Sequence, residues 1–559
     1  MNMNTHTSIL QTILQFHNIG YTGFQIPLFS NTDEQYSFGT IDVITLPRDP
    51  IPYTWDVKFS IDCSASMSDK CRDGRTKLQH ITHTLCNILR LFVSYETQVF
   101  NVCIHIFNEE IHTVIDFITV SRENIDSLIA KISSIYDNGT TNLVNPIKTT
   151  NLQMRDRKME FPGHKLLHFM LTDGLDSCGN SSDKIVNSIN SEYETIVLGF
   201  GIDHDAKTLS KIGNKPMCSY GFIAEIEKSG IVYGEFIHNV MYRAFTNVTI
   251  EMELSEIYSW ETNTWSTKLD IGNLACDLKK TFYVRTKQDH MSVSGNLFGI
   301  QCSVLGNTQY ELLDTIHPIP ELIVQCDDTI HPVDLFNHMY RYKTLELLYE
   351  ANQIDIPSYL DSIWLRHFDE SHKIPDKKEI DMMKKKLLEF YIDMRNYTKE
   401  NYPDGNSFME SLLDDIYICR ISFENINARI YSTTRHRTQG NQNVYTPTSI
   451  YDVITGNNSY KSVSFADDEM YIDSQLSCSS NDIIDLDIHL DEPPIYNFRT
   501  MTPRFTRKTP YSTPTTLGLS ADEAIFNNHN ITQFTQEAYT SPTLLKIIRS
   551  TSDEDTTCM

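Results

Sequence analysis

Residues 62–67, Asp-Cys-Ser-Ala-Ser-Met, directly follow an apolar run at residues 55–61. Such a run predicts a buried strand, so these residues lie in the loop at its carboxyl end. Ligands of open α/β sheets bind outside the carboxyl ends of the strands. Asp62, Ser64 and Ser66 alternate along the loop and present one carboxylate and two hydroxyls, which are hard oxygen donors suited to Mg²⁺ rather than to a soft metal ion.

Two further oxygen donors lie at similar predicted edges farther along the chain. Thr141 lies in residues 139–143, Gly-Thr-Thr-Asn-Leu, and Asp173 lies in residues 171–174, Leu-Thr-Asp-Gly. The second segment directly follows another apolar run, so Asp173 is also expected at the carboxyl edge of the sheet.

Residues 51–245 alternate short apolar runs with helical segments, which predicts a doubly wound α/β domain with a mostly parallel sheet. Apolar side chains recur at helical spacing from Leu78 to Phe92 and form one stripe that can pack on a sheet. Further helices are expected after Ser121 and over residues 234–245. The predicted strands are residues 55–61, 99–107, 166–171 and 195–200.

The flanking regions have other patterns. Residues 1–50 are expected to be an N-terminal extension with β segments. Residues 246–328 predict a small β-sandwich, because apolar and polar residues alternate from Val248 to Leu254 and short strand-like runs follow. Residues 329–432 predict a helical region, with runs at 342–351, 378–397 and 408–422. Residues 433–559 are rich in Thr, Ser, Asn, Asp and Pro, which predicts a mostly disordered tail that is dispensable for folding.

In the order of its oxygen donors, the α/β region resembles the von Willebrand factor type A family. That family has a metal-ion-dependent adhesion site made of an Asp-x-Ser-x-Ser loop with a distant Thr and Asp. The loop pattern alone is common by chance, whereas its conjunction with the segments at 139–143 and 171–174 is specific. Looser motifs at residues 199–205, 219–223 and 270–274 resemble members with a following β domain and helical region, which occur in plants, fungi and amoebae.

The resemblance implies roles for the five residues. Ser64, Ser66 and Thr141 would contact Mg²⁺ or Mn²⁺ directly, and Asp62 and Asp173 would act mainly through water molecules. One coordination position would stay open for an aspartate or glutamate of a protein partner.

Several residues depart from the family pattern or could be mistaken for sites. Ala65 replaces a usual Gly, which is tolerable if its φ is negative. Lys58 and Ser60 are unexpectedly polar for a central strand, and the sequence offers no explanation for Lys58. His80 and His83 lie opposite the apolar stripe of their helix and are expected to be solvated.

Two other motifs are better explained by structural roles than by ligand binding or catalysis. Gly199-x-Gly201 has His204 where a dinucleotide fingerprint needs Gly, so Asp203 is expected to cap the next helix, which ends near Gly213. Residues 367–372 contain His, Asp, Glu and Ser, but their crowding along one segment provides neither an oxyanion hole nor an orienting order for a hydrolase triad.

The composition excludes several classes of protein. With 47 Lys and Arg against 73 Asp and Glu, the net charge is −26, which argues against general nucleic-acid or anionic-membrane binding. The sequence contains no run of about 18 apolar residues, so no membrane span is predicted. The 12 cysteines contain no Cys-x-x-Cys pair, so zinc-finger and RING chemistry are not indicated. A glycan on the sequon at Asn138 would obstruct the metal-site loop, which favours a cytoplasmic, intracellular chain.

The leading hypothesis is an intracellular, non-enzymatic adaptor or scaffold that binds an acidic residue of a partner through the metal ion. One alternative is a ubiquitin-ligase-related protein. Another is a structural or virion protein with a vestigial metal site, since the abundance of Ile, Asn, Asp and Lys suggests an AT-rich genome such as that of an amoeba or a large DNA virus. The sequence leaves the partner and the oligomeric state open.

Overall fold

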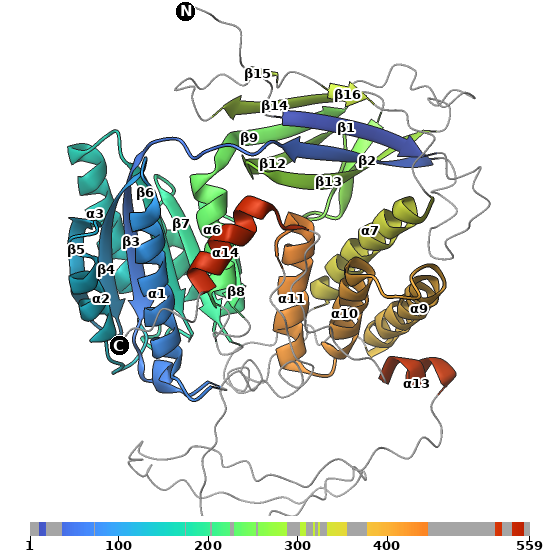
Figure 1. The fold of residues 1–559 in the computed structure, drawn as a ribbon. Coiled ribbons are helices and arrows are strands. Elements are labelled where there is room, and N and C mark those ends of the chain that lie inside the picture. Colours follow the sequence, from blue (N-terminus) through green and yellow to red (C-terminus); the bar gives the residue numbers. More distant parts are fainter. Residues whose placement is uncertain are drawn as a thin grey trace, which may run out of the picture.

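The computed structural model describes residues 10–17, 36–71, 73–173, 175–201, 204–223, 229–252, 255–287, 302–308, 317–318, 322–324, 332–354, 377–444, 520–527 and 539–552. These residues form an α/β domain, a pair of β-sheets and a group of helices, which lie against one another (Figure 1). Asp203 and residues 367–372, which were considered above, lie outside the described residues. Among the residues described, no helix is both long and apolar enough to cross a membrane.

The sheet of the α/β domain has six strands in the order β5-β4-β3-β6-β7-β8. All neighbours are parallel except β4 and β5, which pair antiparallel at one edge. The strands are β3 Thr54–Asp62, β4 Val99–Phe107, β5 Ile111–Thr119, β6 Lys165–Thr172, β7 Glu194–Phe200 and β8 Cys218–Ile223. The four predicted strands agree with β3, β4, β6 and β7 to within one residue, whereas the edge strands β5 and β8 were not predicted.

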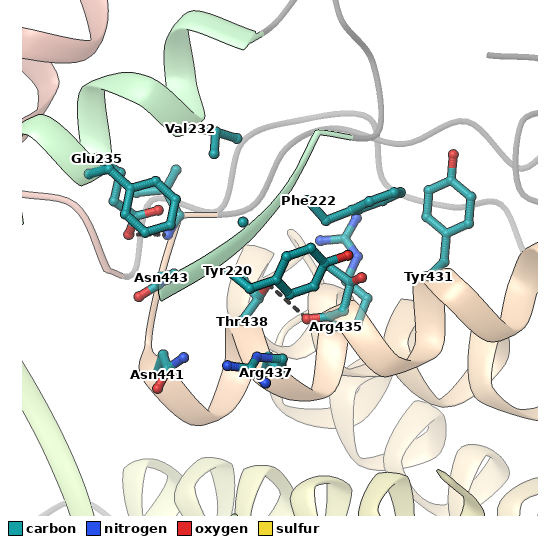
Figure 2. Close-up of a pocket in the computed structure, with 14 residues that line it drawn as sticks. Tyr220, Phe222, Val232, Glu235, Tyr431, Arg435, Arg437, Thr438, Asn441 and Asn443 are labelled. Atoms are coloured by element: carbon teal, nitrogen blue, oxygen red, sulfur yellow. Dashed lines mark hydrogen bonds between the residues drawn. The ribbon is translucent and has the colours of Figure 1, made fainter. Parts of the chain in front are cut away.

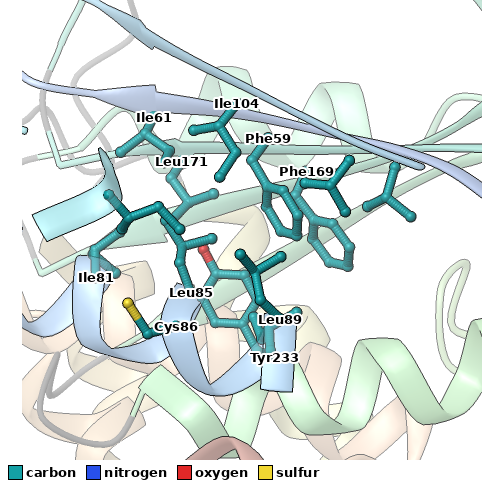
Figure 3. Packing of buried hydrophobic residues seen from close by; sticks show 14 of the residues in the cluster. Phe59, Ile61, Ile81, Leu85, Cys86, Leu89, Ile104, Phe169, Leu171 and Tyr233 are labelled. Atoms are coloured by element: carbon teal, nitrogen blue, oxygen red, sulfur yellow. The ribbon is translucent and has the colours of Figure 1, made fainter. Parts of the chain in front are cut away.

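Helix α1 carries the apolar stripe that the sequence predicts and packs it on the central strands. Its residues Ile81, Leu85 and Leu89 are fully buried against the sheet (Figure 3). There they join Phe59 of β3 and Phe169 of β6, whose rings stack with centroids 5.3 Å apart. The helices of the domain are α1 Lys77–Ser94, α2 Ile125–Ser133, α3 Val144–Glu160, α4 Ser182–Ser188, α5 Ala206–Gly213 and α6 Ser229–Met241.

The last helix of this domain differs from its prediction. We expected a helix at residues 234–245, but α6 spans Ser229–Met241 and strand β9 begins at Arg243. Apolar residues crowd the whole of this stretch, so their spacing alone does not mark where helix gives way to strand. The polar helix α3 was not predicted, because few of its residues form an apolar stripe.

Two further sheets form the β domain, with orders β11-β10-β13-β2-β1-β16 and β12-β9-β14-β15. Strand β2 pairs with β13 along its whole length, and β1 pairs with β2. Residues 1–50 are therefore not a separate extension, because their described strands complete the first of these sheets. The strands are β1 Leu10–His17, β2 Tyr36–Thr45, β9 Arg243–Met252, β10 Ser255–Ser259, β11 Thr264–Ser266, β12 Lys268–Ala275, β13 Leu278–Lys287, β14 Cys302–Thr308, β15 His317–Pro318 and β16 Leu322–Val324.

The helical region packs on the β domain, and its helices are joined to one another by side-chain contacts. Arg341 of α7 donates a hydrogen bond to the hydroxyl of Tyr283 in β13 (2.7 Å) and another to the main-chain oxygen of Gln439 in α11. The helices are α7 Pro332–Gln353, α9 Lys377–Asn401, α10 Ser407–Ile421 and α11 Ile426–Asn441. The predicted domain boundary at residue 432 was wrong, since it falls inside α11.

Helix α11 also faces the α/β domain across a small cavity of about 50 Å³ (Figure 2). Phe222 of β8 meets Tyr431 edge to face, with centroids 5.3 Å apart, and Arg437 lies over the ring of Tyr220. The cavity has room for only a few water molecules, so it is part of the packing between the two regions.

The expectation of a mostly disordered tail is wrong for two helices beyond residue 433. Helix α13 spans Ala521–Asn527, and α14 spans Pro542–Ser552 and packs on α6 and α1 of the α/β domain (Figure 1). Leu544, Ile547, Ile548 and Thr551 lie at helical spacing and are buried, and Ile547 belongs to the main core of the α/β domain. A single amphipathic helix can be stabilised by a distant partner even when its flanking sequence is polar.

Candidate metal centre

Asp62 is the last residue of β3, and its carboxylate organises the loop that follows. One oxygen, Oδ1, accepts a hydrogen bond from the main-chain N–H of Ser64 (2.9 Å). The other, Oδ2, accepts one from the hydroxyl of Thr172 at the end of β6 (2.6 Å). The side chain of Asp62 is fully buried. The carboxylate thus ties two neighbouring strand ends together at the carboxyl edge of the sheet.

The two loop serines and Asp173 converge beside Asp62. The Oγ atoms of Ser64 and Ser66 lie 3.1 Å apart. Ser66 Oγ also donates a hydrogen bond to Asp173 Oδ1 over 2.7 Å, although the two residues are 107 positions apart in the chain. Hydrogen bonds therefore bring four of the five predicted site residues together at one place. These four are Asp62, Ser64, Ser66 and Asp173.

Thr141 is brought to the same edge through the main chain of its loop. The N–H of Ala65 donates to the oxygen of Gly139 (3.0 Å), and the N–H of Asn138 donates to the oxygen of Cys63 (2.7 Å). Thr141 itself is buried, with 4% of its surface exposed, and its N–H donates to Ser177 Oγ (2.9 Å). These bonds hold the threonine loop between the serine loop and the segment that follows Asp173.

Two buried carboxylates at this edge create a demand for positive charge. Burial, together with the negative charge of Asp173, raises the pKa of Asp62 to about 6, against the lowering effect of hydrogen bonds from Thr172 and Ser64. Both aspartates are fully buried. A cation between them would offset the cost of keeping both ionised.

A lysine that the sequence analysis missed supplies one such charge. Lys77 Nζ lies 2.6 Å from Asp173 Oδ2, and the side chains are 6% and 0% exposed. The same nitrogen lies 3.5 Å from Asp69 Oδ2. A sequence signal exists, since the capping box of Thr76 and Gln79 places Lys77 in the first turn of α1, where a positive charge opposes the helix dipole.

Other residues that were missed hold the threonine loop in place. Glu109, just beyond β4, accepts hydrogen bonds from the N–H (2.7 Å) and the hydroxyl of Thr140. Gly139 has a φ of +79°, a left-handed backbone conformation that favours glycine in this turn. Asp176 Oδ2 accepts a hydrogen bond from the N–H of Leu143 (2.9 Å). Polar residues directly after β4 and β6 are the signal that could have indicated them.

The structure explains the departures from the family pattern. Ala65 begins a short 3-10 helix, Ala65–Ser68, whose backbone has negative φ, so its methyl group is tolerated as expected. Lys58 is fully buried and its Nζ donates to Gln153 of α3, and burial lowers its pKa to about 8. Ser60 Oγ lies 3.0 Å from His168 Nε2. The polar face of β3 thus meets the polar helix α3.

Two expectations about neighbouring residues need correction. His80 was expected to be solvated but is buried, and its Nε2 lies 3.1 Å from Asp73 Oδ1. The segment between the metal loop and α1, which carries Asp73, therefore lies against the first turns of the helix. The cap of α5 is Asp205 rather than Asp203, because the Asp205 side chain accepts a hydrogen bond from the N–H of Thr208 (2.9 Å).

The donor set suits a hard divalent cation. Three hydroxyls and two carboxylates are oxygen ligands of the kind that Mg²⁺ and Mn²⁺ prefer. Within the described residues, no group of three or more His, Cys, Asp or Glu is placed to hold a metal ion. The candidate centre is of a different kind, since Ser64, Ser66 and Thr141 supply most of its donors.

The family model of the von Willebrand factor type A (VWA) domain matches residues 56–231. Comparison with curated proteins gave no match. Among solved structures, the chain is similar to the von Willebrand factor type A protein from Catenulispora acidiphila, with 12% identity and a TM-score of 0.39, over 63% of this chain and 83% of that one.

Two other solved structures are similar at the same low level. The ArnB paralog VWA2 from Sulfolobus acidocaldarius is 14% identical, with a TM-score of 0.38, over 76% of this chain and 98% of that one. Proximal thread matrix protein 1 from the mussel byssus, with a zinc-occupied metal-ion-dependent adhesion motif, is 12% identical, with a TM-score of 0.29, over 37% of this chain and 51% of that one. By the family match and the topology of the sheet, residues 56–231 of this chain are a von Willebrand factor type A domain.

Proposed function

We propose that the VWA domain binds a protein partner through a divalent cation, with an aspartate or glutamate of the partner as the last ligand. The observation that carries this proposal is the convergence of Ser64, Ser66 and Asp173 beside the buried Asp62. Domains of this family commonly mediate protein interactions and bind metal ions. Mg²⁺ is the proposed physiological ion and Mn²⁺ the alternative, because both prefer oxygen donors.

The proposed roles follow from the donor chemistry. Ser64, Ser66 and Thr141 would hold the ion by their neutral hydroxyls, and Asp62 and Asp173 would supply negative charge mainly through water. A dication held chiefly by neutral hydroxyls stays electrophilic and attracts a carboxylate. Truncation of one partner of a charge pair in a partly desolvated cleft costs on the order of 2 to 5 kcal/mol of binding free energy.

Exposed apolar residues at the rim of the centre support a protein partner. Tyr136, in the segment that leads to Thr141, is 71% exposed. Leu175, two residues after Asp173, is 44% exposed. Aromatic and apolar side chains around a polar anchor are typical of protein interfaces. A partner segment with an acidic residue next to an apolar one would suit this rim.

The proposal is of a non-enzymatic adaptor or scaffold in a reducing, intracellular compartment. The exposed Cys178 and the buried Cys63 beside the centre are free thiols. Thiols of this kind persist in the cytosol. The β domain and the helices would present the VWA domain to its partner.

The test is capture of partners by the full-length protein in Mg²⁺ and again in EDTA, followed by calorimetry with the partner that Mg²⁺ retains. We expect chelation to release the partner. Thr141→Ala at saturating Mg²⁺ should weaken partner binding more than metal binding. Ser68→Ala is the matched control, because Ser68 is an exposed hydroxyl just beyond the metal loop that bonds only to the oxygen of Ala65 among the contacts described. Partner affinity that EDTA leaves unchanged would assign binding to another surface.

A further inference from the structure

We infer that Lys77 is a tethered cation that competes with the divalent ion for Asp173 and thereby sets the metal affinity of the centre. This inference rests on the proposed function, since it concerns the same site.

The contact has the features of a charge pair that belongs to the site. Lys77 Nζ lies 2.6 Å from Asp173 Oδ2, on the carboxylate whose other oxygen accepts the hydrogen bond of Ser66. The side chain of Lys77 is 6% exposed and that of Asp173 is fully buried. A buried ammonium is costly unless it is paired, and so is a buried carboxylate. In the metal-free centre, Lys77 therefore provides the charge that Asp173 and its neighbour Asp62 require.

A second carboxylate lies close enough to pair with the Lys77 ammonium in place of Asp173. Asp69 Oδ2 lies 3.5 Å from Lys77 Nζ, and the Asp69 side chain is 33% exposed. The two residues are already joined through the main chain, because the N–H of Lys77 donates to the oxygen of Asp69 (3.0 Å). A small change of the flexible lysine side chain can exchange Asp173 for Asp69 without leaving the ammonium unpaired. Binding of a dication would thus move Lys77 outward.

The position of Lys77 is not explained by the helix it belongs to. It occupies the first turn of α1, where a cation opposes the helix dipole and an acidic residue is favoured. The first turn of α1 has no acidic residue, and the helix start is already capped by Thr76 and Gln79. Its ammonium instead pairs with Asp173 of the metal centre and lies near Asp69.

The inference predicts opposite effects of one substitution in two states. Lys77→Met keeps most of the side-chain length but removes the charge. In EDTA it should lower the melting temperature, because Asp173 and Asp62 lose their counter-ion. In Mg²⁺ it should tighten metal binding by about tenfold or more, because a positive charge within a few Å of the ion is gone. Lys77→Arg keeps the charge and should resemble the wild type in both respects.

The experiment is calorimetric titration of the full-length proteins with MgCl₂ and with MnCl₂, together with melting curves in EDTA. Asp69→Asn, which removes the second carboxylate, should weaken metal binding more than the control Asp73→Asn does. Asp73 is an equally exposed acid that pairs with Arg75 and His80 rather than with Lys77. If Lys77→Met is too unstable in EDTA to titrate, Lys77→Met with Asp173→Asn should recover melting temperature, which supports the pairing without metal.

The outcomes separate this inference from the proposed function. If the wild type binds Mg²⁺ and Lys77→Met binds it equally or more weakly, the inference is overturned and the metal-dependent function stands. If only Lys77→Met binds Mg²⁺, the inference is supported and the wild-type centre is neutralised by its own lysine, which overturns the proposed function. If neither protein binds Mg²⁺ or Mn²⁺, both are overturned.

Discussion

Thr551 donates a hydrogen bond from its hydroxyl to the main-chain oxygen of Gly230 (2.6 Å), across 321 positions of sequence. This bond joins α14 to α6, the last helix of the VWA domain. The approach is close because α6 carries glycine at the contact: a Cβ at Gly234 would lie 2.9 Å from the Cα of Ile548. Helix α14 is therefore part of the folded VWA domain, although the rest of the chain separates the two helices.

Replacement of Ile547 should destabilise the VWA domain from outside its own sequence. Ile547 is 3% exposed and belongs to the main core of the domain. Ile547→Ala should lower the free energy of unfolding by about 2 to 4 kcal/mol, through lost burial and the cavity left behind. Urea denaturation of the full-length protein measures this. Lys546→Ala, on the exposed face of the same helix, should change it by less than about 0.5 kcal/mol. Equal effects of the two would mean that α14 does not contribute to the core.

Metal binding should depend on Asp62. With Mg²⁺ at ten times its dissociation constant, the wild type should gain roughly 1.4 kcal/mol of unfolding free energy, because the ion binds only the native state. Asp62→Ala should remove that gain, since the carboxylate that organises the serine loop is lost. Asp126→Ala, an exposed acid in the first turn of α2, should keep it. The measurement is the melting temperature with and without Mg²⁺, and a matching shift in Asp62→Ala would contradict the assignment.

Replacement of Lys58, which is buried in β3, by an uncharged residue should stabilise the protein. Burial lowers the pKa of Lys58 from 10.5 to about 8, so below pH 8 the folded state carries a charged ammonium at a cost. This cost is fully present at pH 7 and decreases as the pH rises from about 8 to 10.5. Lys58→Met should raise the free energy of unfolding at pH 7 by on the order of 2 kcal/mol. Gln153, its partner, is only partly buried and can turn to water.

Denaturation at neutral and alkaline pH distinguishes this cause from general packing. The advantage of Lys58→Met over the wild type should shrink as the pH rises from about 8 to 10.5, because the folded lysine loses its proton before the unfolded one does. Lys131→Met, an exposed lysine on α2, is the matched control and should have little effect. An advantage that stays constant with pH would indicate that packing, not charge, is responsible.

Because of Glu235, the free energy of unfolding should fall as the pH rises from mildly acidic to alkaline. Burial raises its pKa to about 7 in the folded state, against the lowering effects of the Val444 N–H and the positive charge of Lys280. A carboxyl whose folded pKa exceeds its unfolded value of 4.5 favours the folded state below 4.5. That contribution is lost as the pH rises through 7. Glu235→Gln can still accept the hydrogen bond from Val444 and should abolish this loss, which is on the order of 2 kcal/mol.

The measurement is the free energy of unfolding of both proteins at pH 5.5 and pH 8. We expect the wild type to lose more stability than Glu235→Gln over this interval. Glu160→Gln, an exposed residue at the end of α3, should follow the wild type. Parallel pH profiles for Glu235→Gln and the wild type would show that this carboxyl is ionised at no cost.

Local sequence patterns predicted the elements whose own residues carry the signal. The apolar runs of β6 and β7 are nearly continuous because both faces of a central parallel strand are buried, whereas β3 alternates its apolar residues with Asp56, Lys58 and Ser60. The stripe of α1 has helical spacing because only one face meets the sheet. For the same reason Asp62 and Asp173 could be placed at strand ends, where their side chains leave the sheet on the same edge.

By itself, then, the sequence determined the α/β class of residues 56–231 and the strand ends that carry Asp62 and Asp173. The pairing of β2 with β13, the packing of α14 into the core and the contact of Lys77 with Asp173 became known only from the folded chain. An apolar stripe encodes that a face must be buried but not which distant segment buries it. A charged side chain likewise carries no local sign of the partner that neutralises it.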